Sequence, residues 1–232
     1  MYIIGDLHSN IEKLNELLNS LKLARGDSLI FLGDYIDKGR ATDETIIKLN
    51  EIKKEFNCIF IKGDHEFVWE RYLNHNETFR KDFLLKYGSA EALKHYTDKP
   101  EKLISEDDII AIKKFMGPYL DFIKDTKDYY LGDNFLAIHA GLREEQLSES
   151  PIQFTEENYF LREKKMNLKK QYLNRYRVVA GHTYFGPEPL VLEGYIGLDL
   201  GAGYDGYLAA LDPEKNEIIR SDGKIFNLNK KI

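Results

Sequence analysis

Short apolar runs alternate with longer amphipathic segments in the first quarter of the chain. Residues 2–4, 29–32 and 59–61 are short runs of apolar side chains, which are typical of buried strands. Between them, residues 10–23 and 42–56 carry apolar side chains at helical spacing. The alternation of strand, helix, strand, helix and strand predicts parallel pairing with helical crossovers.

The pattern of apolar and polar residues changes after the third predicted strand. From residue 67 to 128 it is helical, aromatic and charged, which indicates a helical cap inserted into one domain of residues 1–232. These helices either cover one edge of the core or grip a substrate, and the sequence leaves both alternatives open.

A β pattern returns after the cap. Glycines and an Asp-Pro pair separate the last segments and predict an antiparallel meander. The predicted strands are 135–138, 177–180, 195–198, 207–211 and 217–220. We therefore expect an α/β fold, on the border of α+β, with a two-layered β core flanked by helices.

Side chains that can bind a metal follow five of the apolar runs directly. They are Asp6, His8, Asp34, Asp37, Asp64, His65, His139 and His182. In open α/β folds the ligand crevice lies outside the carboxyl ends of the strands, so these groups should meet at one point. Asp6 and His8 are two residues apart and project from the same face of an extended segment. A single Gly-Asp after a strand is typical of a turn, but five elements of this kind, each directly after a strand, together predict a metal site.

The order of these motifs resembles that of a known family. Asp-x-His, Gly-Asp-x-x-Asp, Gly-x-His-Glu, His-Ala-Gly and Gly-His-Thr are similar to the motifs of the calcineurin-like metallophosphoesterases. More narrowly, they resemble the bacterial and phage branch of the Ser/Thr protein phosphatases, to which symmetrical dinucleoside tetraphosphate hydrolases are close. The resemblance runs from residue 5 to about residue 211 and includes residues 161–163 and 196–202. It implies a four-layer sandwich with a helical cap.

The resemblance also implies roles for the residues. Asp6 and His8 would hold one metal, Asp34 would bridge two, and the second would be completed by Asp64, His139 and His182. His65, oriented by Asp37, would be the general acid, and a metal-bridging hydroxide would be the nucleophile. The candidate phosphate-binding residues are Lys38, Arg40, Lys62 and Arg162. We expect two divalent ions, Mn²⁺ first, with Fe, Zn²⁺ and Ni²⁺ as alternatives.

Three positions depart from the family pattern. Lys38 stands where the family has arginine, and the sequence does not decide whether Lys38 or Arg40 takes over its role. Asp64 stands where the family has asparagine, which predicts tighter metal retention. Ser9 replaces a glycine, and we expect Asn10 to cap the next helix and leave Ser9 facing the cleft.

Composition narrows the choice of partner and compartment. The net charge of −6 argues against binding to nucleic-acid polymers, whereas bound metals could still attract small anions. No apolar stretch is long enough to span a bilayer. Cys58 has no cysteine partner and follows the pattern of a buried thiol in a reducing compartment. Residues 1–4 show no signal-peptide pattern, so we expect a cytoplasmic protein, with its oligomeric state left open.

We therefore expect a phosphoesterase that hydrolyses phosphate monoesters, most closely a Ser/Thr protein phosphatase with a phosphorylated protein or peptide as substrate. The alternative is a dinucleoside polyphosphate hydrolase, whose adenine would need a stacking platform. The cap offers Trp69, Tyr72, Phe79, Phe83, Tyr87 and Tyr96 for that purpose. A remote alternative is an inactive binding scaffold, but that predicts missing ligands or a missing acid. His75 and His95 lie in the cap and receive no role.

Overall fold

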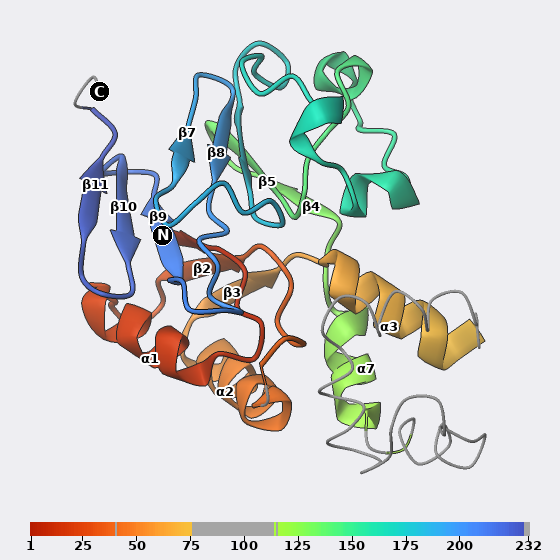
Figure 1. Cartoon of the computed structure of the whole chain (residues 1–232), viewed down its shortest axis with the longest axis vertical. Coiled ribbons are helices and arrows are strands. Elements are labelled where there is room, and N and C mark those ends of the chain that lie inside the picture. Colours follow the sequence, from red (N-terminus) through yellow and green to blue (C-terminus); the bar gives the residue numbers. More distant parts are fainter. Residues whose placement is uncertain (40, 76–113, 115, 230–232) are drawn as a thin grey trace.

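Two packed β-sheets form the centre of the molecule (Figure 1). The computed structural model describes residues 1–39, 41–75, 114 and 116–229. The six-stranded sheet has the order β11-β10-β9-β1-β2-β3. Its strands are β1 Tyr2–Ile4, β2 Ser28–Phe31, β3 Asn57–Phe60, β9 Ala209–Asp212, β10 Glu217–Arg220 and β11 Ile225–Asn227. In this sheet β1, β2 and β3 are parallel, as the sequence predicts. The predicted antiparallel pairing of β9 with β10 is confirmed, and β11 extends it. The strand at 195–198, expected as the first of this meander, is instead β8 of the other sheet and pairs parallel with β6.

The five-stranded sheet has the order β4-β5-β6-β8-β7. Its strands are β4 Tyr129–Leu131, β5 Phe135–Ile138, β6 Arg177–Ala180, β7 Leu190–Val191 and β8 Tyr195–Gly197. The central strands β5, β6 and β8 run parallel to one another, and β4 and β7 close the edges in antiparallel pairing. The hydrophobic pattern predicts β5 and β6 to the residue but misses β4, β7 and β11, which are short and lie at sheet edges.

Three apolar layers hold the sandwich together. The layer between the sheets contains Ile3, Ile30 and Leu32 from one sheet, and Ala137 and Val179 from the other. The outer face of the six-stranded sheet packs against α1 Ile11–Ser20 and α2 Thr42–Glu55, which lie together in Figure 1. The outer face of the five-stranded sheet is covered by the long segment between β5 and β6. These layers confirm the predicted β core flanked by helices.

Two further helices, α3 Asp64–His75 and α7 Gly117–Lys124, contact each other beside the core (Figure 1). They lie at the two ends of the predicted cap, most of which falls outside the described residues. Three short 3₁₀ helices follow β5. They are η2 Glu145–Ser148, η3 Glu156–Tyr159 and η4 Glu163–Lys165. No helix in the described part is long and apolar enough to cross a bilayer.

Candidate metal centre

The residues after five parallel strands converge at one edge of the sandwich. Asp6 and His8 follow β1, Asp34 follows β2, Asp64 follows β3, and His139 and His182 follow β5 and β6. All six side chains are buried, the most exposed being His182 at 7%. Burial of so many ionisable groups is costly unless they bind one another or a metal.

Four of these residues form one tight group. One ligand atom from each of Asp34, Asp64, His139 and His182 lies within 4.8 Å of the others. His139 Nε2 is 3.1 Å from Asp64 Oδ1 and 3.4 Å from Asp34 Oδ1. His182 Nδ1 is 3.2 Å from the same Asp64 oxygen. The predicted ligands of the second metal are therefore brought together.

A second group shares Asp34 with the first. It consists of His8, Asp34 and His65, whose ligand atoms also lie within 4.8 Å of one another. His8 Nε2 is 3.3 Å from Asp34 Oδ2, and His65 Nε2 is 3.8 Å from the same oxygen. Asp34 thus lies between two groups, which is the position the sequence predicts for a bridging residue.

Asp6 is predicted to join His8 but belongs to neither group. Its Oδ2 accepts a hydrogen bond of 2.8 Å from the backbone N–H of His182, and its Oδ1 is buried without a hydrogen-bond partner. A Cβ at Gly181 would overlap Oδ1, so glycine is required where the two strand ends meet. This contact ties the end of β1 to the end of β6.

Backbone carbonyls orient two of the histidines. His8 Nδ1 lies 3.1 Å from the carbonyl oxygen of Ile36, and His139 Nδ1 lies 2.8 Å from that of Leu32. A carbonyl accepts only from a protonated nitrogen, so each contact places a proton on Nδ1 and leaves Nε2 as the atom that could bind a metal. Metal-binding histidines are commonly held in this way.

His65 is held from its other side by a carboxylate. Its Nδ1 lies 2.6 Å from Asp37 Oδ2, and the indole N–H of Trp69 donates to Asp37 at 3.0 Å. All three side chains are buried, and His65 Nε2 faces Asp34. Burial lowers the pKa of His65, but the carboxylates of Asp34 and Asp37 outweigh it and raise the pKa to about 10. Without bound metal, the imidazole is therefore protonated at neutral pH.

Several candidate residues have a left-handed backbone. A positive φ is uncommon outside glycine, and such residues gather at functional sites. The candidates with φ between 49° and 69° are His8, Asp34, Asp37, Lys38 and His182. Sharp left-handed turns directly after the strands aim successive side chains into the same small volume, at a conformational cost that the surrounding fold must offset.

The electrostatics of the group are strongly unfavourable for its acids. Burial and the charge of Asp199 raise the pKa of Asp6 well above its ordinary value, and burial and Asp64 raise that of Asp34. Burial also opposes ionisation of Asp64, but His182 and His139 lower its pKa well below the ordinary range. A cluster with this many buried carboxylates needs cations nearby.

Divalent metal ions fit these residues. Asp6 Oδ1 and His182 Nε2 are buried polar atoms without a hydrogen-bond partner. The Nε2 atoms of His8 and His139 face carboxylate oxygens, so imidazole and carboxylate donors stand together. Mixed carboxylate and imidazole donors suit Mn²⁺, Fe and Zn²⁺. The buried cluster could therefore hold metal in two adjacent places that share Asp34.

The predicted phosphate-binding cations differ in where they lie. Lys38 Nζ is 2.6 Å from His8 Nε2, at the centre itself. Arg162 Nη1 donates to the backbone carbonyl of His182 at 3.1 Å, which places its guanidinium beside a candidate ligand. Lys62 instead forms a 2.7 Å ion pair with Glu70 on α3. Arg40 lies outside the described residues.

Asn10 caps α1 as predicted, because its side chain accepts a hydrogen bond of 3.0 Å from the backbone N–H of Lys13. The companion prediction, that Ser9 faces the cleft freely, is wrong. Ser9 is 3% exposed, and its hydroxyl lies 3.1 Å from that of Thr42 at the start of α2. Ser9 therefore joins two helix starts.

Sequence reasoning gave no role to Glu66, although it stands in a quoted motif. Its Oε2 accepts the backbone N–H groups of Asp34 and Gly63, at 2.7 and 3.0 Å. Its Oε1 accepts the N–H of Tyr35 at 3.1 Å and the hydroxyl of Tyr119 at 2.8 Å. This buried carboxylate fixes the two loops that carry Asp34 and Asp64. Its position directly after His65 in the sequence could have indicated a role at this site.

Known proteins share this fold. The family model for the calcineurin-like phosphoesterases matches residues 1–208. Among solved structures, a cold-active protein-tyrosine phosphatase of a psychrophilic Shewanella species superposes with a TM-score of 0.60 at 19% identity, covering 98% of this chain and 79% of that one.

Two other solved structures give the same fold. A putative diadenosine tetraphosphatase has a TM-score of 0.53 at 17% identity, covering 97% of this chain and 90% of that one. A serine/threonine phosphatase from Saccharomyces cerevisiae also has a TM-score of 0.53, at 12% identity, covering 100% and 80%. Because the family model matches residues 1–208, which include the whole five-stranded sheet, strands β1 to β3 and all six candidate metal ligands, the chain belongs to the calcineurin-like phosphoesterase family.

Proposed function

We propose that this protein is a two-metal phosphatase that hydrolyses phosphate monoesters, most closely of the Ser/Thr protein phosphatase type. One observation carries the proposal: His65, which faces Asp34 in the second group, is held on its other side by the buried carboxylate of Asp37. A cluster that only stored metal would have no need of a protonated imidazole beside it.

The residues divide into ligands and a proton donor. As the family resemblance implies, Asp6, His8 and Asp34 would hold one ion. Asp34, Asp64, His139 and His182, whose ligand atoms lie together, would hold the other. When bound, two such ions neutralise phosphate charge and activate a water at neutral pH. Lys38 and Arg162 approach the same place and can add positive charge around the phosphate oxygens.

His65 supplies the proton that the leaving group needs. Hydrolysis adds the oxygen of water to phosphorus and breaks the bond from phosphorus to the ester oxygen. His65 Nε2 gives its proton to that leaving oxygen, while Asp37 accepts from Nδ1–H and holds the ring in place. Trp69 fixes Asp37 in turn.

A second candidate is the hydrolysis of dinucleoside polyphosphates, and the exposed aromatic side chains beside the centre favour it. Tyr204 is 70% exposed, with Lys38 Nζ 5.2 Å from its ring, and Tyr184 is 54% exposed and follows His182 closely. Either ring could stack on a base. Trp69, expected among the stacking aromatics of the cap, is wholly buried and cannot.

The structure does not test the remaining cap residues that are predicted to stack on a base. Phe79, Phe83, Tyr87 and Tyr96 lie outside the described residues, as does His95, and the side chains of Tyr72 and His75 are not described either.

Product analysis separates the two candidates. Purified protein loaded with Mn²⁺ is offered a phosphothreonine peptide and diadenosine tetraphosphate in parallel. Phosphate release mainly from the peptide supports the protein phosphatase. Preferential conversion of the dinucleotide to ADP supports the polyphosphate hydrolase. No turnover of either, with two metals bound, would contradict both and favour the binding scaffold.

A further inference from the structure

A pocket of about 220 Å³ lies at the end of the sandwich opposite the metal centre. It opens between the two sheets, since Leu211 belongs to β9 and Ile196 to β8. Strand β6 connects the two ends: it begins at Arg177 beside the pocket and is followed by His182 at the centre. Five residues of extended chain separate them, on the order of 15 Å. We call this the distal pocket.

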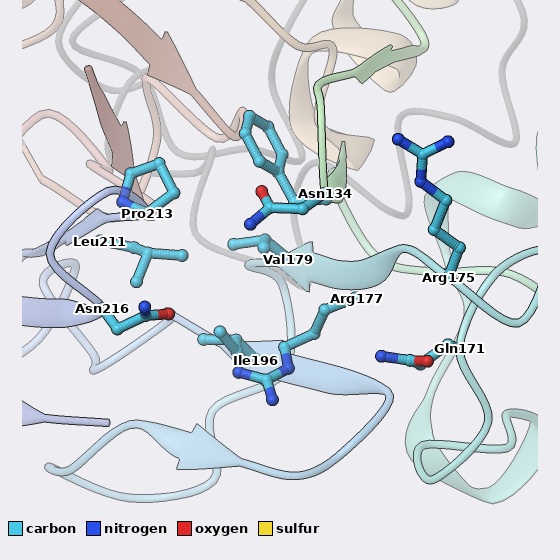
Figure 2. Close-up of a pocket in the computed structure, with 10 residues that line it drawn as sticks. Asn134, Gln171, Arg175, Arg177, Val179, Ile196, Leu211, Pro213 and Asn216 are labelled. Carbon is cyan, nitrogen blue, oxygen red and sulfur yellow. The ribbon is translucent and has the colours of Figure 1, made fainter. Parts of the chain in front are cut away.

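The floor of the distal pocket is apolar and belongs to the layer between the sheets. Phe135, Val179, Ile196 and Leu211 line it, and all are at least 95% buried. Polar side chains stand around this floor: Asn134, Gln171, Arg175, Arg177 and Asn216. Figure 2 shows Asn216, Leu211 and Pro213 on one side and Gln171 and Arg175 on the other, with Val179 and Ile196 between them.

The two arginines have positive charge that no carboxylate neutralises within the described residues. Arg177 Nε donates to the backbone carbonyl of Glu193 at 3.1 Å, and Arg175 Nη2 donates to that of Asp133 at 3.2 Å. By contrast, Arg220 and Lys224 of the neighbouring strands and turns are paired with Asp222 and Glu188. In a chain of net charge −6, unpaired guanidinium groups at a pocket favour an anion there.

Arg177 is the better placed of the two. It shares a strand face with Val179, since the two are two residues apart, and it is half-buried. Its Nε bond to Glu193 fixes the guanidinium and leaves Nη1 and Nη2 as a fork. Such a fork matches two oxygens of a carboxylate or phosphate. In Figure 2 the guanidinium of Arg175 points away from that of Arg177, so Arg175 contributes charge from the rim.

We propose that the distal pocket binds a compact organic anion. The carboxylate or phosphate group is held by the fork of Arg177, with the amides of Gln171 and Asn216 at the side. The small organic body lies over Phe135, which at 5% is the most exposed of the apolar residues in the floor. The pocket volume equals the volume that about seven water molecules occupy in the liquid. A ligand with one ring or one short branched chain, together with its headgroup, fits this volume. This site is independent of the proposed phosphatase activity.

Amide NMR of the full chain loaded with Zn²⁺ tests the proposal. Zn²⁺ has no unpaired electrons and so does not broaden nearby signals, and the amide signals of the distal pocket and of the metal centre can be followed separately. The probes share one ring: benzoate, phenylphosphonate and neutral benzamide. We expect benzoate or phenylphosphonate to shift the signals of residues 134, 171, 177 and 216 saturably below about 10 mM. Which of the two binds more tightly decides between a carboxylate and a phosphate headgroup. Benzamide should bind at least about tenfold more weakly, because it lacks the charge.

Substitutions complete the test. Arg177→Gln should weaken binding about tenfold or more, Arg177→Lys should have an intermediate effect, and Arg175→Gln should weaken it two- to threefold. Arg25→Gln, an exposed arginine on another loop, is the matched control and should change nothing. The proposal fails if shifts appear only around His139 and His182, if benzamide binds as well as the anions, or if neither Arg175→Gln nor Arg177→Lys alters binding.

Discussion

The two ends of the β-sandwich contrast sharply although the same strands run between them. At the carboxyl ends of β1, β2, β5 and β6 lie buried acids and imidazoles on left-handed turns, close to one another and to Glu66. At the amino end of β6 lies an apolar pocket with two arginines at its rim. One end concentrates negative charge inside the protein, and the other places positive charge at its surface.

The contrast follows from what each end can stabilise. Buried carboxylates are tolerated where several loops supply N–H donors and where cations can enter. At the distal end the loops carry the neutral amides of Asn134, Gln171 and Asn216, and the charge comes from the long side chains of Arg175 and Arg177. Reactive chemistry is therefore expected at the first end, and binding without turnover at the second.

The largest expected effect concerns Asp34, which both metal groups share. Asp34→Ala should reduce phosphatase activity at least about 10⁴-fold, because both ions lose a ligand. Metal content, measured by mass spectrometry, should fall below two ions per chain. Benzoate binding at the distal pocket should not change. Retention of two tightly bound ions would remove Asp34 from the bridging position.

Replacing His65 should lower the rate without removing metal. His65→Asn should reduce kcat about 10³-fold for a phosphothreonine peptide, whose leaving alkoxide needs a proton, and much less for p-nitrophenyl phosphate. Metal content is measured as the control and should stay at two ions per chain. An equal loss with both substrates, accompanied by loss of metal, would make His65 a ligand rather than an acid.

The pKa of His65 gives a prediction that needs no substrate. In protein treated with EDTA, NMR should show the imidazole titrating near pH 10. Because this pKa is raised above the unfolded value of about 6.5, the protonated ring stabilises the fold fully below pH ~6.5 and loses this contribution as the pH rises through about 10. Asp37→Asn should lower the pKa. Titration near 6.5 in both proteins would contradict the pairing.

Glu66 should act through the loops that it holds. Glu66→Gln replaces one acceptor oxygen with an N–H₂ group, which leaves two buried donors unsatisfied and should reduce stability by about 3 kcal/mol. Metal affinity should fall about 10- to 100-fold, as for groups that orient ligands. Glu70→Gln, a partly exposed acid on the same helix, is the control. Unchanged metal affinity in Glu66→Gln would limit Glu66 to a structural role.

The smallest effect is expected at the aromatic side chains beside the centre. If a base stacks on Tyr204, Tyr204→Leu should lower kcat/KM for diadenosine tetraphosphate about three- to tenfold more than for a phosphothreonine peptide. Tyr130→Leu, a partly exposed tyrosine on β4 of the other sheet, provides the comparison. An equal change with both substrates would exclude stacking on this ring.

Local pattern determined a large part of this protein. Apolar runs predicted the central strands, and helical spacing predicted α1 and α2, because both are consequences of neighbouring residues alternating between core and solvent. Position after a strand predicted that Asp6, His8, Asp34, Asp64, His139 and His182 lie together. The expectation that their strands belong to one sheet was wrong, because the carboxyl ends of parallel strands from two packed sheets meet at this edge. Edge strands β4, β7 and β11 were missed because, unlike the equally short β1 and β8, they are at most partly buried and form no core-facing apolar run.

Only the tertiary structure decided which side chains meet across the chain. Lys62 is two residues before the candidate ligand Asp64 in the sequence but forms an ion pair with Glu70 on α3. Glu66 accepts a hydrogen bond from the backbone N–H of Asp34, 32 residues earlier in the chain. Arg175 and Arg177 gave no signal in the sequence, because their pocket exists only where β9 of one sheet faces β6 and β8 of the other. Local pattern carries the period of an element, but side-chain partners depend on the packing of elements far apart in the chain.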